Sequence, residues 1–405
     1  MFDNEMFGIS RREALSMDPQ QRVMLQTAYR ALEDAGYVPD STPSFSRRTF
    51  GCFIGNATLD YTDNLRDHID VYYSPAHFLS PTGQCKPFDD SADGYCRSEG
   101  CAAFVIKKLN DAILEGDRIL GVIRGIEINQ SGNAHSITHP HSPTQEYLFQ
   151  TLLKKSQVHP HQVRTQAGDP NELLSIRGAF CNGRDPGNLL HFTSIKANIG
   201  HCEAASGGAA LAKLLLMMRH GKIPPQISLK TLNPKIKDLG TDGSAIDRDG
   251  ATWPRSSRHP RLALLNNFGA AGSNGALILQ EYSSLKATPQ NEEQCEAHSY
   301  MLGFSARSHT SLLAYKDALI SYLEAPSLPS SLRDAAYTST ARRQIYDYRI
   351  SVTGSTIQEI VDNLRNADIY NIRESANPQP RAVFAFSGQG SQVKLSITVH
   401  LDLRN

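Results

Sequence analysis

The segment "SIKANIGHCEAASGGAALAKLLL", residues 194–216, decides the fold of this 405-residue chain. An apolar segment runs into Asn198–His201, and a helix of small and apolar residues follows from Glu203 to His220. Because this helix is apolar almost all round, we expect it to be buried on every side at the centre of its domain. Gly221 and Pro224 predict its end.

The segments around this helix predict a layered α/β domain. Residues 50–56 and 101–109 are predicted as buried strands, and residues 121–130 alternate between apolar and polar side chains like a further strand. Residues 261–282 have the pattern of a strand, a glycine turn and a second strand. Strands and helices that alternate along a chain in this way favour an α/β fold.

Composition divides the chain into four parts. Residues 1–282 contain the α/β pattern, and residues 283–300 are polar and lack periodicity, which is typical of a linker. Residues 301–380 predict a small α/β module, with an amphipathic helix at 309–325. Residues 381–405 begin with a new strand and glycine turn, and we interpret them as the truncated start of another domain.

Charge and cysteine usage exclude several classes of protein. Lys+Arg and Asp+Glu both number 41, so no general electrostatic attraction to nucleic acid or to an anionic membrane is expected. The longest apolar run, Ala209–Met218, is interrupted by Lys213 and is too short to span a bilayer. Seven scattered cysteines and no signal-peptide pattern at the N-terminus predict a cytoplasmic protein with reduced thiols.

Several blocks of the sequence, in the same order, resemble the β-ketoacyl synthase (ketosynthase) domain of iterative type I polyketide synthases. The segment "SGNAHSITHPHSPTQ" (131–145) resembles the corresponding sequence of the fungal non-reducing subgroup. The other blocks are "FGISRREALSMDPQQRVMLQTAYRALEDAGY" (7–37), "FLSPTGQCKPFDDSADGYCRSEG" (78–100), "SIKANIGHCEAASG" (194–207) and "NNFGAAGSNGALIL" (266–279).

The resemblance implies a thiolase-like layered αβαβα fold for residues 1–282. It implies that residues 301–380 are the module between ketosynthase and acyltransferase, and that "FAFSGQGSQ" (384–392) opens the acyltransferase. The implied reaction is a decarboxylative Claisen condensation of a malonyl thioester with an acyl-cysteine thioester. The implied partners are an acyl carrier protein that bears phosphopantetheine and a second copy of the domain, and no cofactor is expected on the chain itself.

The same resemblance assigns the candidate site residues by motif. In "GHCE", His201 matches the second catalytic histidine, and Lys196 in "SIKANIGH" matches the lysine that supports the site through hydrogen bonds. Phe268 and Gly269 in "NNFGAAG", together with Asn198, match residues of the substrate pocket. Two histidines of the family polarise the malonyl thioester and stabilise the enolate that attacks the acyl-cysteine.

Two blocks of the family pattern are absent. The D-T-A-C-S-S-S block, which carries the nucleophile, is missing where "DNLRDHIDVYYS" runs straight into Pro75, so the junction lies near Ser74. The E-A-H-G-T-G-T block, which carries the first histidine, is cut between Val163 and Arg164. We therefore expect an incomplete fold, and no cysteine is assigned as a nucleophile.

Other thiols and histidines are interpreted as structural. Cys85, Cys96 and Cys202 are taken as packed or solvated thiols, and His161 as a loop residue instead of a replacement for the lost histidine. The histidines of "AHSITHPH" match an entrance loop that the family uses without metal, so no metal site is expected at His135, His139 and His141.

Three hypotheses for function stay open at this stage. The first is a spliced remnant of a ketosynthase that cannot condense thioesters. The second is a non-catalytic module that docks on intact synthases or on acyl carrier protein. The third is an active megasynthase whose coding sequence has been read without some of its exons, and sequencing of the transcript would distinguish it from the other two.

Overall fold

A computed structural model of the chain describes residues 2–38, 42–44, 50–56, 79–132, 141–167, 173–185, 187–236, 239–255, 259–269, 272–283, 299–325 and 331–371. The chain divides into two compact units. The first comprises Met1–His298 with Ala341–Gln344, and the second comprises Ser299–Thr340 with Ile345–Asn405. Most of the expected linker and all of the expected acyltransferase start lie outside the described residues.

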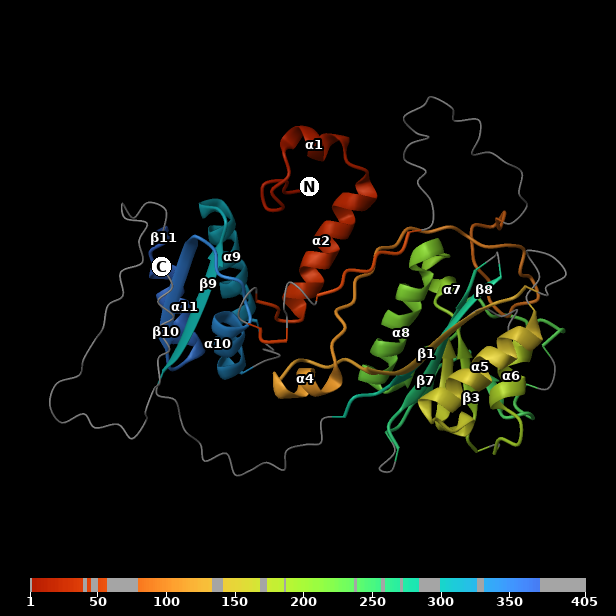
Figure 1. Cartoon of the computed structure of the whole chain (residues 1–405). Coiled ribbons are helices and arrows are strands. Elements are labelled where there is room, and N and C mark those ends of the chain that lie inside the picture. The colour runs from red at the N-terminus through yellow and green to blue at the C-terminus, as the bar shows by residue number, and fades with distance from the viewer. Residues whose placement is uncertain are drawn as a thin grey trace, which may run out of the picture. The chain divides into compact units, whose positions relative to one another are not determined.

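A six-stranded mixed sheet forms the core of the first unit (Figure 1). Its strand order is β1-β8-β7-β2-β3-β5, with antiparallel pairing from β1 to β7 and parallel pairing from β7 to β5. The strands confirm the predictions for residues 121–130 and 261–282. Their bounds are Val122–Gln130 for β1, Val163–Ala167 for β2, Leu190–Thr193 for β3, Ser244–Ile246 for β5, Leu262–Phe268 for β7 and Ser273–Gln280 for β8.

Helices pack on both faces of this sheet. Side chains of α5 (Ser142–Ser156) and α6 (Leu173–Phe180) form one buried cluster with the sheet, and α8 (Ser206–His220) forms another on the opposite face. Strand β7 serves both clusters, because successive side chains of a strand point to opposite faces. Leu262 and Leu264 join the cluster with α5 and α6, and Ala263 and Leu265 join the one with α8.

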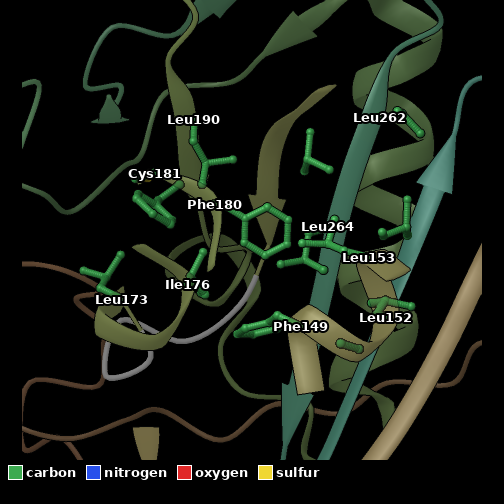
Figure 2. Packing of buried hydrophobic residues seen from close by; sticks show 14 of the residues in the cluster. Phe149, Leu152, Leu153, Leu173, Ile176, Phe180, Cys181, Leu190, Leu262 and Leu264 are labelled. Carbon is green, nitrogen blue, oxygen red and sulfur yellow. The ribbon is translucent and has the colours of Figure 1, made fainter. Parts of the chain in front are cut away.

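The larger cluster accounts for most of the packing in the first unit. Figure 2 shows Phe149 and Leu152 of α5 and Phe180 of α6 directed toward Leu264 of β7. The rings of Phe149 and Phe180 meet edge to face, with centroids 5.8 Å apart. Each fully buried side chain of this size contributes about 2 kcal/mol by removal of apolar surface from water. This half of the domain therefore has a continuous core.

Two segments predicted as buried strands are not strands. Residues 50–56 and 101–108 are extended but lie outside every sheet, and their side chains are largely exposed, with Phe53 97% and Ile106 73% accessible. The prediction was wrong because burial of a strand requires partner strands, and the described residues provide none for these two segments. The second sheet of the expected layered fold is not assembled within the described ranges.

Helix α8 is buried on one side only. Lys213, Leu214 and Met217 are buried against the sheet, whereas Ala212 is exposed and Leu216 is 53% accessible. The expectation of burial on every side was therefore wrong, because only one sheet covers the helix. Its predicted end is confirmed, since Gly221 adopts a φ of 61° as the left-handed cap.

The second unit contains a three-stranded antiparallel sheet, ordered β11-β10-β9, with a core of its own. Leu312 and Leu323 of α9 and Ile360 of α11 are buried in that core. Helix α9 confirms the helix predicted at 309–325. The bounds are Tyr300–Ala306 for β9, His309–Leu323 for α9, Leu332–Ala341 for α10, Tyr348–Gly354 for β10, Ile357–Asn366 for α11 and Tyr370–Asn371 for β11.

Further elements complete the first unit. They are α1 (Arg11–Ser16), α2 (Pro19–Asp34), α4 (Leu109–Leu114), the 3-10 turns η2 (Pro160–Gln162) and η4 (Glu203–Ala205), α7 (Lys196–Ile199), β4 (Lys222–Ile223) and β6 (Ala251–Thr252).

None of the helices in the described ranges is both long and apolar enough to cross a membrane.

Candidate functional site

The turn between β3 and α8 places His201 at the start of that helix. Gly200 ends α7 with a φ of 77°, a backbone conformation that residues other than glycine rarely adopt. A Cβ on Gly200 would also lie only 3.0 Å from the carbonyl oxygen of Cys96. The amide of His201 donates to that same oxygen at 2.7 Å, and the amide of Ser98 donates to the carbonyl of His201 at 3.0 Å.

The imidazole of His201 is oriented by the first residues of η4 and α8, which follow it in the chain. Its Nδ1 accepts a hydrogen bond from the amide of Glu203 at 3.0 Å, and the hydroxyl of Ser206 lies 3.1 Å from the same nitrogen. Because Nδ1 acts as an acceptor, the neutral ring carries its proton on Nε2. The ring of Tyr95 packs beside it, with centroids 5.1 Å apart. His201 can therefore donate a hydrogen bond from Nε2.

A cavity of about 1620 Å³ brings four of the five candidate residues together. Its lining includes Lys196, His201, Phe268 and Gly269. Asn198 is exposed and is not part of this lining. The cavity thus has a histidine, a lysine and an aromatic ring within one space, which suits a polar carbonyl compound with an anionic group.

A carboxamide network that sequence reasoning missed forms part of the cavity wall. Asn274 is buried, and its Nδ2 donates to Asn129 Oδ1 at 2.9 Å and to Ser131 Oγ at 2.8 Å. Asn129 and Asn274 both line the cavity. The network ties β1 to β8 and gives this wall a fixed polar face.

Asp89 fastens the loop that forms another part of the cavity lining. Its carboxylate is buried and accepts hydrogen bonds from the hydroxyl and amide of Ser91 and from the amides of Lys230 and Thr231. Burial alone would raise the pKa of Asp89, but the hydrogen bonds from Ser91, Thr231 and Lys230 outweigh it and hold the pKa well below its usual range. The charged carboxylate is therefore the stable form.

Replacement of Asp89 by Asn is expected to lower the free energy of unfolding of the first unit by about 2 kcal/mol at pH 7. The reason is that the hydroxyl of Ser91 and the amides of Ser91, Lys230 and Thr231 lose a charged acceptor. A group whose pKa is depressed on folding contributes stability above its unfolded pKa and loses it as the pH falls below that value. Chemical denaturation at pH 7 and pH 3 should therefore show a smaller difference between the wild type and Asp89→Asn at the lower pH. The matched control is Asp90→Asn, since Asp90 is exposed; equal losses in both variants would contradict the role of Asp89.

The thiols near the cavity are held by polar neighbours. Cys85 is buried, accepts a hydrogen bond from the amide of Cys96 at 3.2 Å and lies 3.6 Å from its carbonyl oxygen. Cys202 is buried, with its sulfur 3.1 Å from the hydroxyl of Ser98. Farther away, burial raises the pKa of Cys181 to about 11. A thiol that stays protonated at neutral pH is a weak nucleophile.

His161 and His141 are absent from the described lining of the cavity. His161 is partly exposed, and its Nε2 lies 3.1 Å from the carbonyl oxygen of Asn182. His141 Nδ1 lies 2.7 Å from the hydroxyl of Thr144 at the start of α5, and His135 and His139 lie outside the described residues. Within the described ranges, no group of three or more potential metal ligands is gathered in one place.

The second sequence junction falls inside strand β2. Val163 pairs with Leu262 and Thr165 pairs with Ala263, so Arg164 is an extra residue in the pairing with β7. One additional residue in one strand is the pattern of a β-bulge. The backbone of the strand is thus continuous across the junction, although the histidine block that would follow is absent from the sequence.

Comparison with known protein families agrees with this architecture. The profile "Beta-ketoacyl synthase, N-terminal domain" matches residues 1–72 and 68–112, and "Beta-ketoacyl synthase, C-terminal domain" matches residues 120–230. The chain belongs to the β-ketoacyl synthase family. A third profile, "CurL-like, PKS C-terminal", matches residues 300–364 of this ketosynthase-type chain.

Curated relatives of the ketosynthase-type chain are fungal polyketide synthases. "Orsellinic acid synthase" of Beauveria bassiana is 49% identical over 97% of this chain, and "Orsellinic acid synthase armB" of Armillaria mellea is 48% identical over 96%. The "Conidial yellow pigment biosynthesis polyketide synthase" of Emericella nidulans is 36% identical over 97%. The chain spans about a fifth of the length of these relatives, 21% of the Beauveria protein.

Solved structures of ketosynthases share the fold of this chain. The ketosynthase from module 6 of the bacillaene synthase of Bacillus subtilis 168 matches with a TM-score of 0.75 and 25% identity. The match covers 93% of this chain and 77% of that structure. The expected thiolase-like α/β fold is confirmed.

The alignment with the relatives also measures a gap in this chain. The alignment to the Beauveria protein is 473 positions long, and the chain has 405 residues, so at least 473 minus 405, or 68, positions of that relative have no counterpart here. The profile of the N-terminal domain matches in two pieces that meet at residues 68–72. The break in the profile is what an internal deletion close to Ser74 would produce, and the 68 positions are the total over this junction and the one between Val163 and Arg164.

Proposed function

We propose that this chain is a ketosynthase-type domain that binds acyl or malonyl thioesters in the cavity around His201 but does not form an acyl-enzyme. The observation that carries the proposal is the cavity itself, which gathers His201, Lys196, Phe268 and Gly269. The sequence lacks the D-T-A-C-S-S-S block, and the one cysteine in the lining, Cys85, is held by the backbone of Cys96. A thioester would find hydrogen-bond donors there but no activated thiolate.

Each remaining residue has a role in this proposal. His201 Nε2–H donates to the thioester carbonyl oxygen, and the ammonium of Lys196 attracts the carboxylate of a malonyl group. Phe268 and Gly269 shape the wall against which the acyl chain lies. Condensation would need an electrophilic acyl group on a cysteine, and the absence of that cysteine leaves the Claisen step without its second reactant. We propose phosphopantetheine on an acyl carrier protein as the carrier of the thioester.

Incubation of the purified chain with an acyl thioester is expected to leave its intact mass unchanged. The physical reason is that the block with the family nucleophile is absent, and that the sulfurs of Cys85 and Cys202 are packed against Cys96 and Ser98. The intact ketosynthase of the Beauveria orsellinic acid synthase, treated in parallel, is the positive control. A stoichiometric adduct on one cysteine of this chain, lost when that cysteine is replaced, would overturn the proposal.

Malonyl-thioester binding should depend on His201, although no catalytic turnover of the thioester is expected. We expect release of CO₂ at the background rate, and a roughly tenfold weaker affinity in His201→Ala, because one hydrogen bond of about 1.4 kcal/mol is lost. Calorimetric titration measures the affinity, and His161→Ala is the matched control outside the cavity lining. Release of CO₂ above background that disappears in His201→Ala would show an active remnant and refute this part of the proposal.

A second candidate function, a docking module, is favoured by one separate observation. Residues 101–106 are extended, apolar and outside any sheet, which is unusual for a surface that faces water only. The two candidates are compatible, since the cavity and this segment offer different groups to different ligands. The third hypothesis, an active synthase whose exons were missed, predicts a transcript that contains the absent blocks.

A further inference from the structure

Residues 101–106, "CAAFVI", form an extended segment with no paired strand among the described residues, and this edge is called the strand edge below. The segment is extended, and among the described residues none of the backbone hydrogen bonds starts or ends in it. Phe104 and Ile106 are exposed. A row of free backbone donors and acceptors with apolar side chains is a template on which another strand can pair.

The segment is positioned by helix α8. A Cβ placed on Gly208 would lie 2.8 Å from Cβ of Ala102 and 3.6 Å from the ring of Phe104. On the sheet side of the same helix, a Cβ on Gly207 would lie 2.8 Å from Nδ2 of Asn267 in β7. The first turn of the helix therefore contacts β7 on one side and Ala102 and Phe104 on the other, whereas the rest of that second side is uncovered, so the strand edge is held in place by close contact with the start of α8.

Apolar side chains are also uncovered on the face of the sheet that carries α8. A Cβ on Gly125 of β1 would lie 3.2 Å from Leu152 of α5, so Ile126 and Ile128, one and three positions further, point to the opposite face. They are 66% and 75% accessible, and Leu216 of α8 is exposed as well. The strand edge at 101–106, together with Leu216, Ile126 and Ile128, is called the open layer below.

The open layer matches a part of the domain that this chain lacks. The Beauveria relative has at least 68 positions without a counterpart here, divided between the two sequence junctions, and the family profile breaks at residues 68–72, upstream of residues 101–106. A free strand edge calls for a strand, and the uncovered faces of α8 and β1 call for an apolar helix. Both can be supplied by the segment that is missing near Ser74.

We propose that the open layer binds a strand-and-helix segment of a second polypeptide, equivalent to the one absent from this chain. The strand pairs with residues 101–106, and the apolar face of the helix covers Leu216, Ile126 and Ile128. The inference goes beyond thioester binding, and its test does not use a thioester. Ile128 also lines the cavity around His201, but docking and thioester binding are measured separately, so failure of one can be told from failure of the other.

The probe is the part of the Beauveria orsellinic acid synthase that aligns with the gap, tagged and co-expressed with the full chain as a separate polypeptide. We expect a one-to-one complex on size-exclusion chromatography and amide hydrogen exchange at 101–106 slowed at least tenfold. Ile106→Glu and Leu216→Glu should weaken capture of the segment at least tenfold. Leu114→Glu is the matched control, because Leu114 is just as exposed but lies on α4, outside the open layer.

Two outcomes would overturn the proposal. The first is a failure of the open layer to act as the binding surface. It would appear as an absence of capture while circular dichroism shows that the helices of the chain are intact, or as capture that all three variants weaken equally. The second is a concentration-dependent dimer of the chain alone that Ile106→Glu and Leu216→Glu abolish, because the occupant of the open layer would then be a second copy. Capture that only the two open-layer variants weaken supports the proposal.

Discussion

Heating of the full chain should produce two separate unfolding transitions, with the transition of the second unit the sharper and the higher in temperature. Its described part, residues 299–325, 331–340 and 345–371, has a continuous core that includes Leu312 and Ile360. The first unit has a helix, α8, with one side uncovered and two apolar segments without a sheet. We expect its transition to be broad and roughly 10 °C lower, because one lost large core contact costs about 2–5 kcal/mol.

Two core variants assign the transitions to their units. Ile360→Ala should lower only the upper transition, and Leu264→Ala only the lower one, since each side chain is fully buried in the core of one unit. Binding of a hydrophobic dye should rise through the lower transition. We also expect aggregation of the full chain instead of a clean homodimer. A single sharp transition, or a sharp dimer peak on size-exclusion chromatography, would show that the first unit tolerates its gap.

The elements that the sequence predicted correctly are those whose partners are still in the chain. Residues 121–130 alternate and residues 261–282 have a strand, turn and strand pattern, and the strands of both pair with each other, so the local pattern and the tertiary structure agree. Residues 50–56 and 101–109 have an equally strong strand pattern but no neighbouring strand in the described structure. Strand propensity describes how well a segment fits a sheet, and it cannot report that the sheet is missing.

The candidate site shows the same division between local and distant information. His201, Lys196, Phe268 and Gly269 lie in short motifs, so the sequence could name them as candidates, and the structure places them around one cavity. The bonds that build the cavity wall join residues far apart in the chain: Asn274 to Asn129 and Asp89 to Lys230. A buried asparagine or aspartate inside a loop carries no periodic signal, so only the structure reveals its partners.

Replacement of Lys213 is expected to have the second large effect on stability, because Lys213 is a charged group in an apolar core. Its ammonium donates to Thr193 Oγ1 and to the carbonyl oxygen of Ser194, and no carboxylate pairs with it among the described residues. Burial lowers the pKa of Lys213 from 10.5 to about 8. Such a shift corresponds to about 3 kcal/mol of destabilisation at pH 7, where the buried amine must still carry its proton.

Replacement of Lys213 by Met is therefore expected to raise the free energy of unfolding of the first unit by about 2 kcal/mol at pH 7, once the lost hydrogen bonds are deducted. Because the folded pKa lies below the unfolded one, the unfolded wild type binds more protons between pH 8 and 10.5, and its stability rises with pH in that window. Lys213→Met should abolish the rise. Cys181 acts in the opposite direction above pH 9, since its thiol ionises first in the unfolded chain, so the slope is best measured from pH 7.5 to 9.

The matched control for this experiment is Lys222→Met, because Lys222 is an exposed lysine on β4. Chemical denaturation of the wild type, Lys213→Met and Lys222→Met at each pH should give a slope that is lost only in the first variant. A slope that survives in Lys213→Met would place the titrating group elsewhere. Destabilisation of that variant by more than about 1 kcal/mol at pH 7 would mean that the bonds to Thr193 and Ser194 outweigh the cost of the buried charge.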